Sequence, residues 1–113
     1  MSTQQSTFPS TATLTVRELG AFRRILQGLL REREALIAEL DPRAAPHIDV
    51  ATWSSSQSTK RVMGQIAAAL ERINEGTFGT CIRCTQRIAT ERLSVVPYAE
   101  SCVSCQIRAE TSS

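Results

Sequence analysis

Large aromatic side chains are scarce in this sequence, since Phe, Trp and Tyr together make up 4% of its 113 residues. The overall hydrophobic content of 42% is ordinary for a globular protein, so any core has to be built from Leu, Ile, Val and Ala. A chain of this length corresponds to about one domain. These features favour a single small unit of packed helices over a β-sheet.

Long apolar runs are also missing. No segment approaches the roughly 20 apolar residues that an α-helix needs to cross a bilayer. Residues 1–13 are polar and lack the basic start and the apolar stretch of a secretory signal. We therefore expect a cytoplasmic protein that does not associate with membranes, and we expect its cysteines to stay reduced.

Charge of one sign is not concentrated along the chain. Thirteen Lys and Arg residues are balanced by 11 Asp and Glu residues, which gives a formal charge of +2 at pH 7. Basic and acidic residues alternate over residues 31–34, a pattern typical of a solvated helix face with paired charges. Non-specific binding to nucleic acid depends on concentrated Lys and Arg, so this pattern does not indicate a nucleic-acid surface.

Helical periodicity begins at Leu14. Residues 1–13 are rich in Ser, Thr and Gln and show no apolar period, so we expect them to be disordered. The next apolar residues predict a helix over about residues 15–40, with Thr15 or Thr13 as its cap and Glu18 at capping-box spacing from Thr15. Asp41-Pro42 sets its end, because the residue before a proline is displaced from the α conformation. The apolar positions are Leu19, Phe22, Leu26, Leu29, Leu36 and Leu40.

A second helical pattern runs over about residues 54–75, with Ser54 and Gln57 at capping-box spacing. Two helices of similar length joined by a loop, here residues 41–53, most simply fold back as an antiparallel coiled-coil hairpin over residues 14–76. Such a hairpin holds more helix than a small globular core could enclose. We therefore expect the loop to project into solvent as a tip.

Four cysteines form the most specific motif of the chain. Cys81 and Cys84 make one CxxC pair, and Cys102 and Cys105 make a second pair after 17 intervening residues. This spacing is typical of a four-cysteine zinc site, because each CxxC turn presents two sulfurs at the separation that a tetrahedral Zn²⁺ needs. Four protein ligands leave no position open for water or a substrate, so one structural zinc ion is predicted.

The zinc finger is expected over residues 77–109, with up to two very short strands and a C-terminal helix from Cys102, and residues 110–113 form a tail. The finger contains few large apolar residues, so it should unfold without its metal. Two disulfides or two redox-active CxxC pairs are the alternatives, and a reducing compartment and the missing βαβ context disfavour both. No nucleophile–base pair or open metal position is evident, so the protein is not expected to be an enzyme.

Several positions around the cysteines follow, in order, the pattern of a known family. Residues 69–73, 76–81 and 102–106 closely resemble the DksA/TraR family of zinc-finger transcription regulators, and residues 14–30 resemble its first coiled-coil helix. Single matching positions between these segments are Ile88, Arg92, Leu93, Pro97 and Ala99. The short hairpin resembles that of the compact members of this family. The resemblance implies a regulator that binds RNA polymerase, places its hairpin in the secondary channel of the enzyme and brings an acidic tip near the catalytic centre. It also implies no sequence-specific contact with promoter DNA, and we expect a monomer.

The tip departs from the family pattern, because the paired-aspartate motif Asp-x-x-Asp-x-Ala is absent. The predicted loop contains Asp41 and Asp49, the only aspartates in the chain, together with Trp53, and these are the candidates for partner contact. Each also has a plainer interpretation, as a solvated loop carboxylate or as a tryptophan packed on the start of the second helix. Thr85 stands where the family usually has a glycine that permits a left-handed turn.

Two other functions compete with polymerase binding. The first is a zinc-ribbon nucleic-acid-binding protein, which the net charge disfavours, since four bound thiolates and one Zn²⁺ bring the chain close to neutrality. The second is a thiol-based redox sensor in which oxidation of the cysteines ejects the zinc. The second could operate in the same molecule as polymerase binding.

Overall fold

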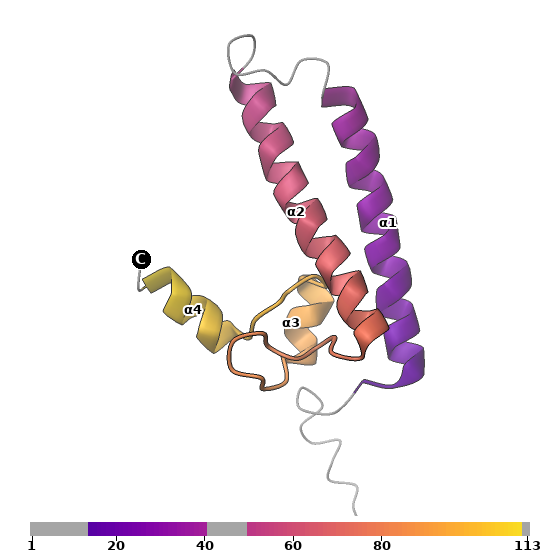
Figure 1. The fold of residues 1–113 in the computed structure, drawn as a ribbon, viewed down its shortest axis with the longest axis vertical. Helices are drawn as coiled ribbons and strands as arrows, with labels where there is room; N and C mark the ends of the chain where they lie inside the picture. Colours follow the sequence, from indigo (N-terminus) through magenta and orange to yellow (C-terminus); the bar gives the residue numbers. More distant parts are fainter. Residues whose placement is uncertain (1–13, 41–49, 112–113) are drawn as a thin grey trace, which may run out of the picture.

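The computed structural model of this protein describes residues 14–40 and 50–111. This part of the chain contains four helices, α1 (Val16–Leu40), α2 (Val50–Glu75), α3 (Thr90–Val95) and α4 (Val103–Thr111). The only β-type pairing in these ranges is an isolated antiparallel bridge between Thr80 and Arg87, in place of the two short strands allowed for above. The predicted mainly α architecture, a helical hairpin joined to a small cysteine-containing lobe, is confirmed (Figure 1).

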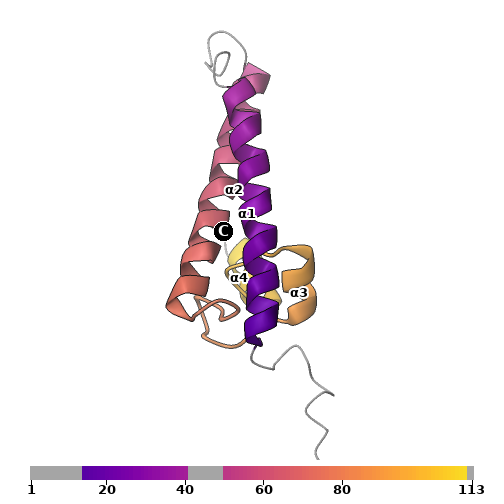
Figure 2. The same cartoon turned by 90° about the vertical axis from the view of Figure 1, so that its right-hand side faces the viewer.

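The two long helices lie side by side and antiparallel, as both views of the ribbon show (Figures 1 and 2). The capping box predicted for α1 is present, because the Thr15 N–H donates to Glu18 Oε1 at 2.8 Å and the Glu18 N–H donates to Thr15 Oγ1 at 3.1 Å. At the same end of the pair, Arg23 Nη1 of α1 donates to Asn74 Oδ1, next to the last residue of α2, at 2.8 Å. These bonds fix where α1 starts and how it is aligned with α2.

The hydrophobic core lies at the base of the hairpin, where α1 and α2 meet the cysteine-containing lobe. Phe22 and Leu26 of α1 are buried, and the Phe22 ring contacts the Phe78 ring of the lobe with centroids 5.3 Å apart. Beyond Leu26 and Ile66, towards the far end of the hairpin, the only buried residue in the described chain is Ser56. The rest of the core comprises Ile66, Ala69, Ile73, Phe78, Cys81, Ile88, Leu93, Ala99 and Cys105. The hairpin is thus anchored at one end only.

The start of the second helix was predicted wrongly. We expected a loop up to residue 53, but α2 begins at Val50, so Trp53 lies in its first turn with 36% of its surface exposed. Ser54 and Asp49 are both of the residue types that precede helices, and the capping-box spacing at Ser54 favoured the later start. A serine inside a helix is only mildly unfavourable, so the helix continues through the serine run over residues 54–56.

Several sequence predictions fall outside the described residues. They are the disorder of residues 1–13, the tip over residues 41–49 with its carboxylates Asp41 and Asp49, and the last two residues of the tail. In the described part of the chain, no helix combines the length and the apolar character needed to cross a membrane.

A short joint connects α2 to the lobe. Gly76 follows α2 directly with φ of 82°, a left-handed conformation that glycine adopts without steric cost. The carbonyl of Arg72 accepts the N–H groups of Thr77 at 2.9 Å and Phe78 at 3.2 Å, which closes the last turn of the helix. The chain then reaches Cys81 only five residues after Gly76. The hairpin and the metal-binding segment are therefore joined without a flexible linker.

Candidate metal centre

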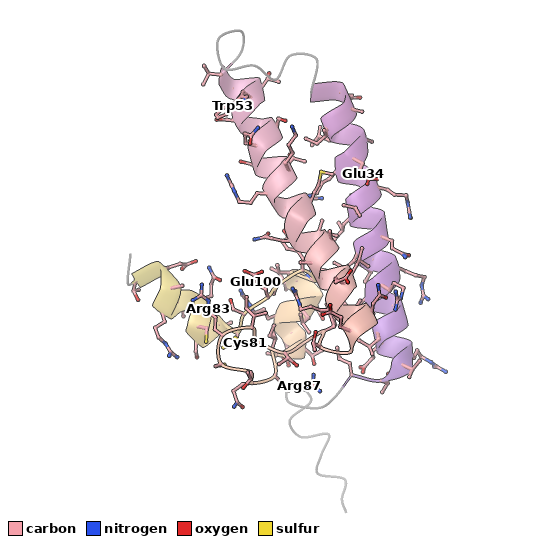
Figure 3. All side chains as sticks on the ribbon, in the orientation of Figure 1. Glu34, Trp53, Cys81, Arg83, Arg87 and Glu100 are labelled. Atoms are coloured by element: carbon pink, nitrogen blue, oxygen red, sulfur yellow. The ribbon has the colours of Figure 1, made fainter. Side chains whose placement is uncertain are left out.

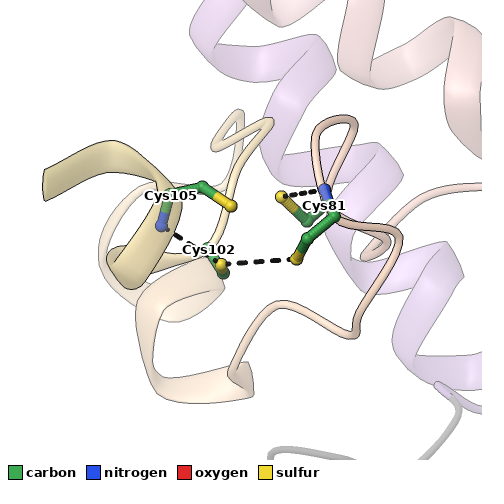
Figure 4. Close-up of side chains that lie close together, drawn as sticks. Cys81, Cys102 and Cys105 are labelled. Atoms are coloured by element: carbon green, nitrogen blue, oxygen red, sulfur yellow. Dashed lines mark hydrogen bonds between the residues drawn. The ribbon is translucent and has the colours of Figure 1, made fainter. Parts of the chain in front are cut away.

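The four cysteines come together in the lobe beside the hairpin base. Cys81 and Cys84 lie in the turn after Thr80. Cys102 lies just before α4 and Cys105 lies in its first turn, and Figure 4 labels Cys81, Cys102 and Cys105. All four Sγ atoms lie within 4.8 Å of one another, and Cys84 Sγ is 3.8 Å from Cys102 Sγ. Four sulfurs around a tetrahedral zinc at ~2.3 Å would be separated by ~3.8 Å, so the donor set fits Zn²⁺ in both type and spacing.

Each CxxC turn directs backbone N–H groups at its first sulfur. Cys81 Sγ accepts the N–H of Arg83 at 3.4 Å and that of Cys84 at 3.5 Å, and Cys102 Sγ accepts the N–H of Cys105 at 3.5 Å. Such donors stabilise negative charge on sulfur, which is the form that binds a metal. The two turns are therefore arranged to hold thiolates before any cation arrives.

The thiol pKa values reflect this arrangement. Burial alone would raise the pKa of Cys81, but backbone hydrogen bonds, the largest from Cys84, lower it from 9.0 to about 6. The pKa of Cys102 is also lowered, mainly by the backbone N–H of Cys105. The pKa of Cys105 is raised to about 12, because its side-chain hydrogen bond to Cys102 and its burial both favour the protonated thiol. A divalent cation would displace the remaining protons and relieve the repulsion between the sulfurs.

Backbone hydrogen bonds of the lobe position the first CxxC turn. The Cys81 N–H donates to the carbonyl of Gln86 at 2.8 Å, and the Thr85 N–H donates to the carbonyl of Cys81 at 3.0 Å. Thr85 has φ of 63°, so the left-handed turn expected from the family pattern is present although the glycine is not. Its hydroxyl donates to the carbonyl of Cys84. A non-glycine residue in this conformation carries a steric cost.

A chain of side-chain hydrogen bonds that sequence reasoning missed positions the second CxxC turn. Arg92 Nε of α3 donates to the carbonyl of Ser101 at 2.9 Å, and the buried Ser101 hydroxyl donates to Gln106 Oε1 at 3.2 Å. Gln106 Nε2 then donates to Glu110 Oε2 at 2.8 Å. Because Ser101 immediately precedes Cys102, these bonds tie α3 and α4 to the metal-binding turn. In the sequence, Arg92 stands out only as a position shared with the DksA/TraR pattern, and no spacing rule marks Ser101.

The remaining site candidate lies far from the cysteines. Trp53 is at the free end of the hairpin, whereas Cys81 is in the lobe at its base (Figure 3). The structure therefore does not bring the candidate partner-contacting residue and the metal centre into one site. Trp53 and the metal centre are connected through the length of α2.

Comparisons with known proteins agree on what this arrangement is. Residues 76–110 match the sequence model of the prokaryotic dksA/traR C4-type zinc finger. The described lobe, with four clustered cysteines inside this match, is thus a four-cysteine zinc finger for one structural zinc ion.

Solved structures resemble most of the chain. Transcription factor DksA2 from Pseudomonas aeruginosa superposes with a TM-score of 0.78 at 21% identity, covering 96% of this chain and 95% of its own. A Chlamydia trachomatis protein, described as an RNA polymerase binding protein and transcriptional regulator, gives a TM-score of 0.58 at 26% identity, with coverages of 89% and 96%. The DnaK suppressor protein from Agrobacterium tumefaciens gives 0.62 at 31% identity, with coverages of 79% and 91%.

Curated proteins add two partial matches. General stress protein 16O of Bacillus subtilis is 27% identical over 99 residues, which is 83% of this chain and 61% of that protein. An uncharacterized protein of Aquifex aeolicus is 39% identical over 49 residues, 43% of this chain and 34% of that protein. The chain therefore spans less than two thirds of the length of either relative. The zinc-finger match together with the similarity to the Agrobacterium protein along most of its length shows that this chain belongs to the DksA/TraR family.

Proposed function

We propose that this protein is a transcription regulator that binds RNA polymerase directly and inserts its helical hairpin into the secondary channel of the enzyme. The observation that carries the proposal is a long hairpin anchored at its base to a zinc finger. The Chlamydia trachomatis relative of similar fold, described as an RNA polymerase binding protein, supports the choice of partner. The protein acts by binding and not by catalysis.

The dimensions of the hairpin suit insertion into a channel. Its helices contain 25 and 26 residues, so each is ~38 Å long at ~1.5 Å per residue. The molecule measures 63 × 34 × 21 Å, and its radius of gyration of 16.9 Å exceeds the ~13 Å of a compact chain of this length. Because the core lies at the base, the distal half of the hairpin presents its whole outer surface to a partner.

The free end of the hairpin supplies the residues proposed to act in the channel. Trp53 in the first turn of α2 is partly exposed and offers an aromatic contact. Asp49 directly precedes α2 in the sequence, and Asp41 directly follows α1. In an enzyme centre that holds Mg²⁺, the ion and its bound waters favour carboxylate oxygens. We therefore assign the active role at the tip to the carboxylate of Asp49, which does not stand between a helix C-terminus and a following proline as Asp41 does. The zinc finger is the base that docks on the polymerase surface.

A binding experiment tests the proposal against its main rival. Tagged, zinc-loaded full-length protein is incubated separately with RNA polymerase from its own organism and with duplex DNA at physiological salt. We expect retention of the polymerase and only weak DNA binding without sequence preference. Retention of DNA but not of polymerase would replace the proposal with the nucleic-acid-binding function.

A matched pair of substitutions tests the role of the tip. Asp49→Asn is expected to leave folding, zinc content and polymerase affinity nearly unchanged while reducing the effect on transcription in a reconstituted assay. Asp41→Asn makes the same chemical change at the other tip carboxylate, and we expect it to have a smaller effect than Asp49→Asn; equal effects would show that the role is not particular to Asp49. If Asp49→Asn retains the full transcriptional effect at equal polymerase occupancy, the carboxylate has no active part and the hairpin works by filling the channel.

A further inference from the structure

A pocket of about 210 Å³ lies directly against the metal-binding sulfurs. Its lining contains Cys84 and Cys105 together with Arg83, Arg108 and Ala109. Arg83 stands between the two cysteines of the first CxxC turn, and Arg108 lies on α4, one turn after Cys105. Two exposed arginines, one from each CxxC half of the zinc finger, thus line the same pocket as two of the metal-binding cysteines.

The charge of a loaded centre explains what these arginines can do. Four thiolates around one Zn²⁺ leave a net charge of −2, which a partly buried site cannot disperse into water. Two guanidinium groups beside the sulfurs would balance that charge. The same balance leaves little attraction for an outside anion, so the pocket is not suited to hold one.

The other charged side chains of the lobe have different roles. Arg92 donates to the carbonyl of Ser101 and Arg87 Nη1 to Thr80 Oγ1, so neither lines the pocket. Among the described residues, the Arg83 side chain has no hydrogen-bond or ion-pair partner, and its backbone N–H already donates to Cys81 Sγ. Arg83 therefore lines the pocket because of its place in the CxxC turn, and no carboxylate of the described residues neutralises its charge.

We propose that Arg83 and Arg108 form an electrostatic clamp on the zinc centre, which slows zinc release and reduces the reactivity of the Cys84 and Cys105 thiolates. Metal binding replaces thiol protons, so the loaded centre is more negative than the protonated, metal-free thiols, and positive charge near its sulfurs stabilises the loaded form. The positive charge also withdraws electron density from the sulfur lone pairs that would attack an electrophile. The clamp is a property of the zinc finger and does not depend on polymerase binding.

The rate of zinc transfer to a chromogenic chelator tests the clamp in the zinc-loaded full chain. Arg83→Gln and Arg108→Gln should each speed release about threefold, the size expected for one exposed charge interaction. Both variants should also react faster with N-ethylmaleimide. Arg83→Lys keeps the charge and should restore slow release, which distinguishes electrostatics from packing. Arg24→Gln, the same charge change on the exposed face of α1, should release zinc at the wild-type rate.

Ionic strength provides a second measurement that a purely structural role would not change. Salt screens exposed charges. Raising the ionic strength from about 0.05 M to about 0.5 M should therefore increase the rate of zinc release from the wild type and reduce the difference in rate between the wild type and Arg83→Gln. Unchanged release in both glutamine variants would overturn the proposal. So would equal acceleration in Arg83→Gln and Arg83→Lys, or an equal effect of Arg24→Gln. Circular dichroism checks that each variant has the helix content of the wild type. If a variant does not fold, the salt dependence of zinc release from the wild type tests the proposal instead.

Discussion

The hairpin and the zinc finger are stabilised in two different ways. In the hairpin, regular apolar spacing places Leu26 and Ile66 at complete burial, and side-chain packing holds two long helices together. In the finger, the ordered elements are short, and backbone hydrogen bonds position four sulfurs for one ion. A buried leucine or isoleucine contributes roughly 1.5–3 kcal/mol, whereas a structural zinc contributes about 10–16 kcal/mol in small domains. The finger should therefore depend on one ion and the hairpin on many small contacts.

Removing one zinc-binding sulfur should have the largest effect, and the effect should fall on the finger and spare the hairpin. Cys84→Ser leaves three thiolates, so we expect the finger to lose zinc and unfold while α1 and α2 keep much of their helicity. Metal analysis and circular dichroism measure the two effects separately. Full zinc content after purification under reducing conditions would contradict the assignment, as would loss of all helical signal.

A core substitution should have the next largest effect. Leu26 is completely buried in the hairpin base, so Leu26→Ala should lower the free energy of unfolding by about 2–5 kcal/mol. Chemical denaturation of the zinc-loaded protein measures it. Leu36→Ala on the same helix is the control, since Leu36 is 42% exposed and lies beyond the core. Equal losses from the two substitutions would show that the distal half is packed as firmly as the base.

Loss of the hydrogen bond that α3 donates should have an intermediate effect on the stability of the finger. Arg92→Gln removes the donor to the Ser101 carbonyl beside Cys102, and bonds from charged donors contribute about 1.5–3 kcal/mol. We expect a lower thermal midpoint for the finger and faster zinc loss, with the helical hairpin unaffected. Arg24→Gln is a suitable comparison, because it makes the same charge change on the exposed face of α1, away from the finger. An equal effect of Arg24→Gln would show that the loss does not come from the Ser101 bond.

The smallest predicted effect is a gain in stability. Thr85→Gly relieves the steric cost of φ at 63° but increases the freedom of the unfolded chain, which leaves a net stabilisation of about 0.5 kcal/mol. The chelator concentration that half-unfolds the finger should rise. Thr85→Ala retains the strained backbone and loses the hydroxyl bond to Cys84, so it should shift that concentration downward.

The same contrast explains how far sequence reasoning reached. The helices of the hairpin follow a repeating apolar pattern, so their existence, their pairing and the capping box at Thr15 and Glu18 could be predicted. The start of α2 could not, because the capping-box spacing occurs at Ser54, whereas the helix begins at Val50. In the finger, the fixed geometry of zinc coordination revealed the cysteines through their spacing alone.

The rest of the finger has no such repeat. Helix α3 contains only six residues, fewer than two turns, so no periodicity marks it. The bond from Arg92 to Ser101 joins residues nine positions apart through a side chain and a carbonyl, which no local pattern encodes. Thr85 is the exception, since its place in the family pattern predicted an unusual backbone conformation that the structure contains.

The joint at Gly76 sets the direction of α2 relative to the zinc finger, and so the position of the far end of the hairpin. With Thr77 and Phe78 both bonded to the Arg72 carbonyl, the direction of α2 is set by residues within one turn of the finger. A rotation of about 10° at this joint would move the end of a ~38 Å helix by roughly 7 Å. A substitution at Gly76 can therefore displace Trp53, although the two residues lie at opposite ends of α2.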